Sequence, residues 1–228
     1  MARKFIEEYA SMDLFGVRHN CPYWSNKITG GFVTVRGFLN GKGEASAIRK
    51  ELLKLLSQTE NSRIIASNAD KVRRLAKQNR LGIDCSGFVY RVWNLLIANK
   101  YGNTADPKME EIFPGGINRT NADKLTSGSA CLKIERIEDI RFGDNLRLNG
   151  GRHVALISEV NADNIVYAHA SSQLTEIQGV HYGEIKIIKP GKDLSEQRWL
   201  EKARAGGNLN KYFKPVRGDG VFRLKILN

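Results

Sequence analysis

The 228-residue sequence predicts an α+β fold. Apolar residues repeat with helical spacing between residues 44 and 102, and they alternate with a period of two in several short runs after residue 140. The segment between these two regions is rich in Gly, Pro, Asn and Asp. Helices followed by short alternating strands are typical of chains whose helices pack on one largely antiparallel sheet.

Helices are expected first. The stretch EASAIRKELLKLLSQ carries Ile48, Leu52 and Leu56 at helical spacing with charges between them, which predicts an amphipathic helix. In NADKVRRLAKQN, Asn68 stands where an N-cap is expected. The stretch SGFVYRVWNLLIANKYG predicts a third helix that ends at Gly102.

Residues 103–140 are expected to form a long irregular connection. The runs DNLRL, HVALISEV, NIVYAHAS, GEIKIIK and VFRLKIL then predict strands of an antiparallel sheet. HVALISEV and NIVYAHAS are expected to form a hairpin through the residues NAD. We therefore divide the chain into a helical basic extension (residues 1–80), a core that carries the chemistry (residues 81–190) and a C-terminal segment with a final strand (residues 191–228).

The composition is that of an ordinary globular protein, with 41% hydrophobic and 26% charged residues. The formal net charge of +12 lies in the flanks: residues 1–84 carry +7, residues 85–183 carry −1 and residues 184–228 carry +6. The sequence has no recognisable nucleic-acid-binding motif, and few aromatics accompany its basic runs, so we expect no specific nucleic-acid partner. Attraction to an anionic cell envelope is physically equivalent, and a solvated basic face is the simpler alternative.

The sequence predicts no transmembrane segment, because no apolar run reaches the roughly 18 residues of a membrane span. The N-terminal stretch lacks the continuous apolar core of a secretory signal. As written, the chain is therefore expected to be cytoplasmic. A mature secreted domain with a new initiator Met would look the same, and would place the protein outside the cell or in the cell wall.

Three cysteines are too few for a disulfide scaffold, and the number is odd. A pair between Cys21 and Cys131 remains open. His19 and Cys21 are close in sequence, but no CxxC, HxxxH or HExxH pattern accompanies them, so we expect no metal site. The run GFLNGKG lacks the spacing of a phosphate-binding loop and is interpreted as a turn, and no cofactor is predicted.

Cys85 lies in GIDCSGFVYRVW, where the third helix is expected to begin. The thiolate is the nucleophilic form of cysteine, and its pKa of about 8.5 falls at a helix N-terminus or beside a protonated histidine. This position predicts an activated nucleophile with a lowered pKa, paired with an imidazolium. A packed free thiol is the alternative interpretation.

Two histidines lie on the predicted hairpin, His153 at the start of HVALISEV and His169 within NIVYAHAS. Their separation of 16 residues is even, so a turn with an odd number of residues would place both side chains on one face of the sheet, and an even turn would separate them. A helix that packs on that face with Cys85 at its N-terminus would complete a cysteine, a histidine and an orienting group. Taken singly, each histidine is more typical of a partly buried structural side chain.

At these residues the sequence resembles the NlpC family of papain-like cysteine peptidases. The motifs that carry the resemblance are DCSGFV, FGDNLRL, GRHVALI and YAHASS, which follow one another in the family's order over residues 84–172. DCSG followed by a helix is the most specific of them. The resemblance implies a papain-like fold with Cys85 as nucleophile, His153 as general base and His169 as the orienting residue, without a metal.

The resemblance also implies hydrolysis of peptide bonds in the stem peptides of bacterial cell-wall peptidoglycan, typically between γ-D-glutamate and a diamino acid. Asp84 and Ser86, which flank the nucleophile, are predicted to contact substrate. INRTNADKL resembles a segment that often precedes the sheet in this family, which makes Arg119 a candidate for binding a carboxylate. Tyr23, in CPYWSN, is a candidate for lining the cleft.

Other functions remain open on the sequence alone. Amidases and acyltransferases use the same triad, and a non-catalytic envelope-binding module could retain the fold. The 68 residues between Cys85 and His153 exceed the usual family spacing, which is consistent with an added loop over the cleft. The motifs do not cover residues 1–80.

Overall fold

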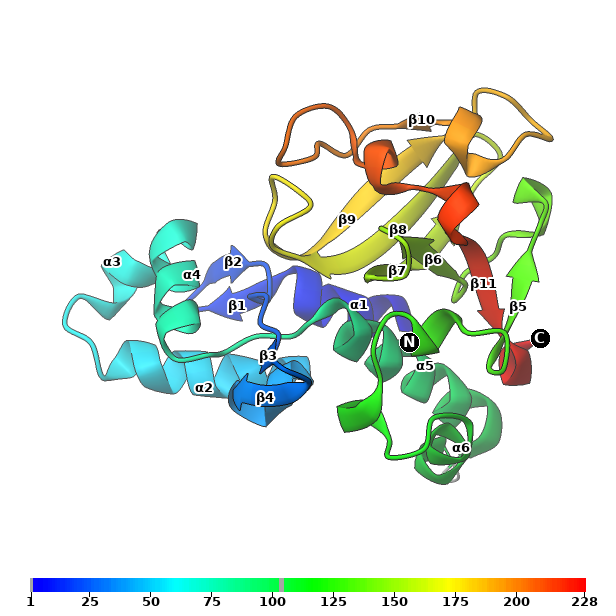
Figure 1. The fold of residues 1–228 in the computed structure, drawn as a ribbon. Helices are drawn as coiled ribbons and strands as arrows, with labels where there is room; N and C mark the ends of the chain where they lie inside the picture. The colour runs from blue at the N-terminus through cyan, green and yellow to red at the C-terminus, as the bar shows by residue number, and fades with distance from the viewer. Residues whose placement is uncertain (1, 103–104) are drawn as a thin grey trace.

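The computed structural model describes residues 2–102 and 105–228 and has a mixed α+β architecture. Helices gather around one end of a curled antiparallel sheet, with α2, α3 and α4 farthest from it (Figure 1). The helices are α1 (Ala2–Ala10), α2 (Ala45–Ser57), α3 (Ser62–Ala66), α4 (Ala69–Gln78), α5 (Cys85–Tyr101) and α6 (Ala105–Ile112).

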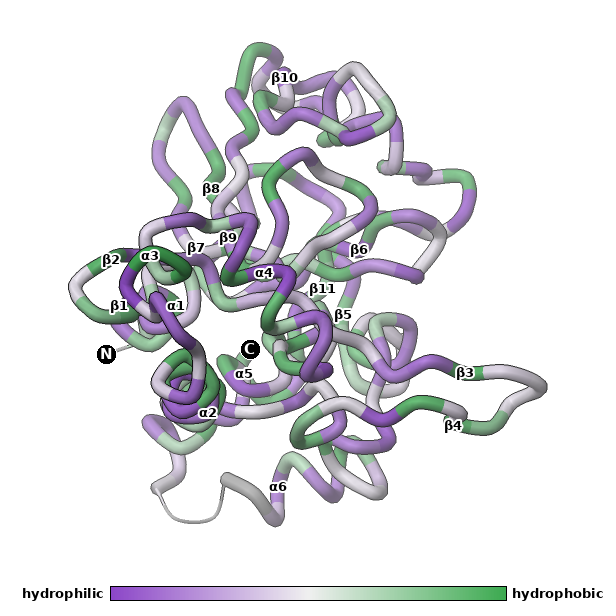
Figure 2. Tube along the Cα trace, turned by 90° about the vertical axis from the view of Figure 1, so that its left-hand side faces the viewer, coloured by the Kyte–Doolittle hydropathy of each residue, from purple (hydrophilic) through white to green (hydrophobic). Residues whose placement is uncertain are grey.

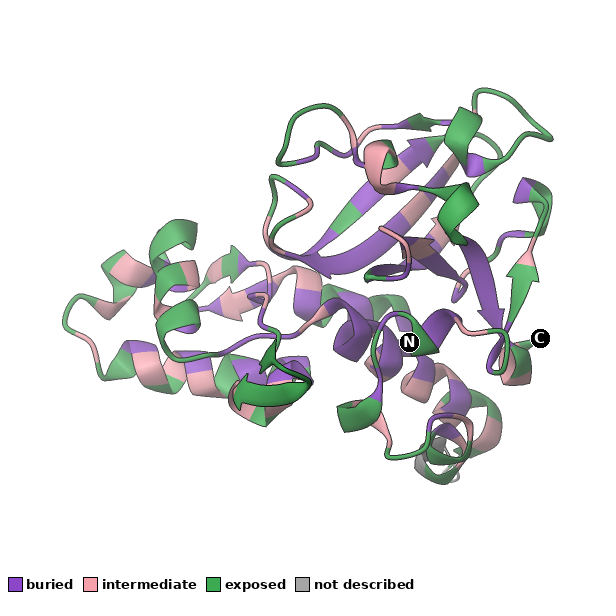
Figure 3. Ribbon diagram, viewed as in Figure 1, coloured by how far each residue is buried: buried purple, intermediate pink, exposed green. Residues whose placement is uncertain are grey.

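The main sheet has seven strands in the order β10-β9-β8-β7-β6-β11-β5, and every neighbouring pair is antiparallel. Its strands are β5 (Cys131–Ile134), β6 (Asn145–Leu148), β7 (His153–Val160), β8 (Asn164–Ser171), β9 (Gly179–Lys186), β10 (Arg198–Trp199) and β11 (Gly220–Leu224). Two small hairpins precede it: β1 (Met12–Leu14) with β2 (Val17–His19), and β3 (Lys27–Thr29) with β4 (Phe32–Val35). The β3–β4 hairpin extends away from the body of the molecule and is exposed (Figures 2 and 3).

The predicted helices are present where local sequence signals placed them. The side chain of Asn68 accepts hydrogen bonds from the backbone N–H groups of Asp70 and Lys71, so it caps α4 as expected. Gly102 follows α5 with a positive φ of 68°, a conformation that favours glycine. The local caps therefore fixed these helix ends.

The expectation of an irregular connection over residues 103–140 was wrong in part. Residues 103 and 104 lie outside the described residues, but α6 and β5 occupy part of the rest. The ring of Phe113, just after α6, stacks on Trp93 of α5 with centroids 6.2 Å apart, and Met109 is fully buried. Tertiary burial of this kind overrides the turn-rich composition of the segment. The strand expected at GEIKIIK also begins earlier, at Gly179.

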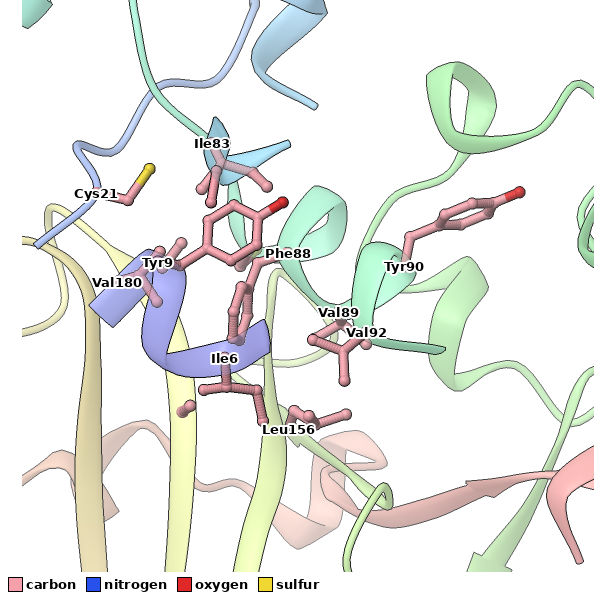
Figure 4. Close-up of a cluster of buried hydrophobic side chains, with 14 of the residues drawn as sticks. Ile6, Tyr9, Cys21, Ile83, Phe88, Val89, Tyr90, Val92, Leu156 and Val180 are labelled. Carbon is pink, nitrogen blue, oxygen red and sulfur yellow. The ribbon is translucent and has the colours of Figure 1, made fainter. Parts of the chain in front are cut away.

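The two faces of the main sheet bury different hydrophobic clusters. One face packs against α5 and α1, and Figure 4 shows Ile6, Tyr9 and Phe88 in one buried cluster with Leu156 and Val180. The other face is covered by the C-terminal segment through Trp199, Leu209 and Phe213. Residues from all three predicted segments of the chain thus contribute to the packing around one sheet. Within the described residues, no helix combines the length and apolarity required to cross a bilayer.

Candidate active site

Helix α5 begins at Cys85 because Asp84 caps it. The Asp84 carboxylate accepts a hydrogen bond from the backbone N–H of Gly87 at 2.6 Å. The same oxygen lies 2.7 Å from Nζ of Lys42, a lysine that is almost fully buried. A capping carboxylate with a buried counter-ion holds the N-terminus of α5 in place.

Ser86 belongs to the same buried network. Its hydroxyl donates to Asp84 at 2.9 Å and accepts from Nζ of Lys42 at 2.5 Å. Lys42 also donates to the backbone carbonyl of Thr120 at 3.2 Å. Asp84 and Ser86 thus have structural partners inside the protein, and a direct contact of either with substrate stays a prediction.

The sulfur of Cys85 lies next to the start of β7, where the backbone N–H of Val154 donates a hydrogen bond to it. The N–H of Ser86 is directed at it as well, and both groups favour the thiolate. Burial outweighs them, and together with the charge of Asp84 it raises the pKa of the Cys85 thiol to about 11. The expectation of a lowered pKa was therefore wrong for the free protein, since a helix N-terminus does not compensate for removing the thiolate from water.

His153 and His169 lie on adjacent antiparallel strands and on the same face of the sheet, as expected. A turn with an odd number of residues does not explain why the two side chains share a face. Val160 pairs with Ile165, so an even number of residues, 161–164, lies between these two paired positions. A β-bulge between Ile157 and Glu159 then adds one unpaired residue to β7 and restores the common face.

Helix α5 packs on the opposite face of the sheet, so the expectation that it covers the histidine face was wrong. The α5 side of the sheet presents Val154, Leu156 and Ala168. Side chains alternate along a strand, and His153 and His169 therefore point to the other side. Cys85, the first residue of α5, meets the backbone at the start of β7, next to His153.

The two imidazoles form a short hydrogen bond. Nε2 of His153 lies 2.7 Å from Nδ1 of His169, and both rings are buried. This contact occupies Nε2 of His153 and leaves Nδ1 as the ring nitrogen for a proton exchange with a thiol. The arrangement places the expected general base, His153, next to the expected orienting residue, His169, which is the order that a triad requires.

The chain of hydrogen bonds continues to a carboxylate that the sequence did not indicate. Oε1 of Glu201 lies 3.0 Å from Nε2 of His169 and 2.6 Å from Nε2 of His181. The hydroxyl of Tyr167 donates to the other carboxylate oxygen at 2.6 Å. Glu201 follows β10 and lies 32 residues after His169, so no local spacing links the two, whereas His181 pairs directly with His169 in the β8–β9 register.

Charge in this cluster is balanced around Glu201. Burial alone would raise the pKa of the Glu201 carboxyl, but the imidazoles of His169 and His181 outweigh it and lower the pKa below the ordinary value. Burial, with the neighbouring His169, lowers the pKa of His153 well below its usual value. Burial also lowers the pKa of His169. His153 is therefore a neutral base in the free protein.

A groove of about 740 Å³, which we call the basic groove, is lined by Tyr23 but not by Cys85, His153 or His169. Tyr23 lines it and adjoins Cys85: burial raises the pKa of the Tyr23 hydroxyl, and the charge of Cys85 adds to this effect. Five basic side chains and one carboxylate line the groove, from the start of β3, from α4 and from the segment after β10: Lys27, Asp70, Arg73, Arg74, Lys77 and Arg204. Such a groove attracts an anionic ligand.

Arg119, the other predicted substrate contact, lies on the exposed turn Ile117–Arg119. It does not line the basic groove, although it directly precedes Thr120, whose carbonyl accepts from Lys42. Its role with a substrate carboxylate stays a prediction. All three cysteines of the chain are free and buried, so Cys21 and Cys131 do not pair.

Comparisons of the chain with family models, with curated proteins and with solved structures found no match.

Proposed function

We propose that this protein is a cysteine peptidase of the NlpC type, with a papain-like fold, that hydrolyses amide bonds in peptidoglycan stem peptides. The observation that carries the proposal is the unbroken hydrogen-bonded series from His153 through His169 to Glu201, which begins one residue before Val154, whose backbone N–H bonds the sulfur of Cys85. A buried series of this kind, on a strand whose backbone contacts a thiol at a helix N-terminus, supports the assignment of an activated nucleophile.

In this mechanism the resting site holds a neutral thiol and a neutral imidazole, as the pKa directions of Cys85 and His153 indicate. When substrate enters, Nδ1 of His153 takes the proton of the thiol while the sulfur attacks the carbonyl carbon of the scissile amide. His169 accepts a hydrogen bond from Nε2 of His153 and thereby holds the ring in the tautomer that has a free Nδ1. The C–N bond then breaks, and the proton on Nδ1 passes to the leaving amine.

Water completes the cycle. His153 removes a proton from a water molecule that attacks the thioester carbon, the S–C bond breaks, and the sulfur regains a proton. Backbone N–H groups at the start of α5, with that of Cys85 first among them, would stabilise the oxyanion in both steps. Each step is proton-neutral overall and uses only groups of the protein, the substrate and water.

The basic groove supports the choice of an anionic peptide substrate. A stem peptide such as L-Ala-γ-D-Glu-diaminopimelate carries carboxylates beside the scissile amide, and five basic side chains line the groove that Tyr23 connects to the thiol. Predominantly positive flanks of the chain also favour approach to an anionic envelope.

The test is mass spectrometry of defined muropeptides incubated with the protein, with Cys85→Ala and with Cys131→Ala. Cys131 is a second buried cysteine, so its variant controls for loss of a buried thiol. Cleavage between γ-D-glutamate and the diamino acid by wild type and Cys131→Ala, but not by Cys85→Ala, is the expected result. Release of an intact stem peptide from muramic acid would identify an amidase, and a product joined to a second amine would identify an acyltransferase. Identical fragments from wild type and Cys85→Ala would remove the enzyme assignment and leave a binding module.

A further inference from the structure

We propose that His169, His181 and Glu201 form a binding site for a divalent transition-metal ion, with Zn²⁺ as the ion that fits best. One donor atom of each residue converges on a common point. Nε2 of His169 and Nε2 of His181 are 3.2 Å apart, and Oε1 of Glu201 lies 3.0 and 2.6 Å from them. All three side chains are almost fully buried.

These separations are close to those around tetrahedral zinc. Bonds of about 2.0–2.1 Å at tetrahedral angles place neighbouring donor atoms roughly 3.3 Å apart. The two imidazole nitrogens already have this spacing. The carboxylate oxygen needs to retreat by about half an ångström, which rotation of a terminal carboxylate supplies. A fourth position is left for water or another ligand.

Each of the three ligands also has the outer partner that metal ligands in proteins require. Nδ1 of His181 bonds the backbone carbonyl of Gly179 at 3.0 Å, and Nδ1 of His169 bonds Nε2 of His153 at 2.7 Å. The free oxygen of Glu201 accepts from the hydroxyl of Tyr167 at 2.6 Å. Such partners fix the orientation of the rings and aim their Nε2 atoms at the ion.

The contact between His181 and Glu201 requires either a hydrogen on the imidazole nitrogen or a metal ion between the two atoms. The carbonyl of Gly179 only accepts, so Nδ1 of His181 carries its hydrogen, and the lone pair of Nε2 faces a carboxylate oxygen 2.6 Å away. Two acceptors at this distance repel unless a cation lies between them. That cation is either a proton or a metal ion, and the metal takes the place of the proton when it binds.

One of the three ligands, Glu201, lines a cavity at the surface. The cavity has a volume of about 390 Å³ and is also lined by the neighbours Leu200 and Lys202, and by Gly183 of β9. This cavity shares no lining residue with the basic groove, so the metal would not need to pass through the substrate groove. The ligands come from β8, β9 and the segment after β10, which is why no short sequence motif reveals them.

If the proposed peptidase function holds, the metal acts as an inhibitor. A metal on Nε2 of His169 leaves that ring with its hydrogen on Nδ1, which then donates to Nε2 of His153. His153 must in turn carry its hydrogen on Nδ1, the nitrogen that receives the proton of Cys85 in catalysis. Zinc thus fixes the general base in the tautomer that cannot accept, without touching the thiol.

The experiment first measures binding alone. Chelator-treated wild type, Cys85→Ala and His181→Gln are dialysed against buffered Zn²⁺, and the bound metal is counted by elemental mass spectrometry. We expect about one zinc per chain in wild type and in Cys85→Ala, and none above background in His181→Gln. Loss of zinc in Cys85→Ala would show that the thiol holds it, and retention in His181→Gln would show a different site; either result overturns the proposal.

A second variant guards against misfolding of His181→Gln. Tyr167→Phe removes only the hydroxyl that holds Glu201 and is expected to weaken zinc binding about 10–100-fold. An unchanged zinc affinity in this variant, with native circular dichroism, would contradict the site. The peptidase assay is then run with and without zinc: full activity of zinc-loaded wild type overturns the inhibitory role. Because binding is counted without substrate, failure of the proposed peptidase function leaves the binding result unaffected.

Discussion

Gly183 leaves the space that the carboxylate of Glu201 occupies. A methyl group at Gly183 would lie 2.3 Å from Oε2 of Glu201 and 2.3 Å from Cζ of Tyr167, and neither separation is sterically possible. The backbone of β9 at this position thus allows the carboxylate to reach His169. Glycine is required here by close approach rather than by an unusual φ.

We predict that Gly183→Ala lowers peptidase activity although residue 183 touches no reacting atom. The new methyl group displaces Glu201 and Tyr167, and a misplacement of about 1 Å in the support of a catalytic group costs up to 100-fold in rate. Overpacking is expected to lower the free energy of unfolding by about 1–3 kcal/mol. Steady-state kinetics and thermal unfolding measure both effects.

Gly128→Ala is the matched control, because a methyl group there meets nothing within 4 Å. It should leave kcat and thermal stability unchanged. Equal activity of Gly183→Ala and Gly128→Ala would show that the position of Glu201 does not matter for catalysis.

Glu201→Gln should lower kcat by about 10–100-fold and leave KM nearly unchanged, because it disturbs the orientation of His169 and not the binding of substrate. The amide has the shape of the carboxylate, but its NH₂ group is a donor. It would face the side chains that now donate hydrogen bonds to Glu201. Glu184→Gln is the control on the neighbouring strand, where the carboxylate only accepts from Asn164. A change confined to KM would place Glu201 in substrate binding.

Alkylation of the free protein by iodoacetamide should modify Cys85 before the other two cysteines. Burial raises the pKa of Cys131 to about 12 and that of Cys21 further, compared with about 11 for Cys85. Because the pKa is raised, the reactive thiolate is scarce at pH 6, and the rate should climb with pH toward 11. Peptide mapping after short exposures gives the order of labelling. A rate that is already maximal at pH 6 would indicate a resting thiolate–imidazolium pair.

Arg74→Glu should weaken substrate binding through the basic groove. The side chain lies on α4 among the basic residues that line the groove. Reversal of one such charge should raise KM about tenfold at low ionic strength, and the effect should shrink as salt shortens the Debye length to about 3 Å at 1 M. Lys71→Glu makes the same change of charge on an exposed, non-lining position of α4. Equal effects of the two variants would mean that only net charge matters.

Local signals predicted the parts of the fold that depend on neighbouring residues. The cap at Asn68 and the start of α5 after Asp84 follow from side chain to backbone hydrogen bonds within three residues. The strands β7 and β8 follow from alternation of side chains, and they place His153 and His169 on adjacent strands. These elements could be predicted because the residues that decide them are close together in sequence.

The remainder of the site depends on contacts between distant segments. Glu201 is one of many acidic residues and lies outside any regular motif, so only the folded chain shows that it meets His169. His181 could have been identified from its inward-facing position in the run GVHYG. The predicted strand began two residues after it and so did not include it. The raised pKa of Cys85 likewise depends on burial by the whole fold, which the sequence around the cysteine does not contain.

The bulge at Ser158 has a consequence for how related sequences are to be searched. Residues can be inserted in the loop 161–163 without changing which face His153 occupies, because the strand pairing on either side stays in register. A one-residue deletion at the bulge would turn His153 to the opposite face of the sheet. A one-residue deletion in the loop would shorten the chain equally but leave the face unchanged. A search template with a fixed interval between the two histidines therefore discards functional relatives with a longer loop, and it retains chains in which a deletion at the bulge is offset by a one-residue insertion in the loop. A template that fixes the six residues from His153 to Ser158 and lets the loop vary would separate them.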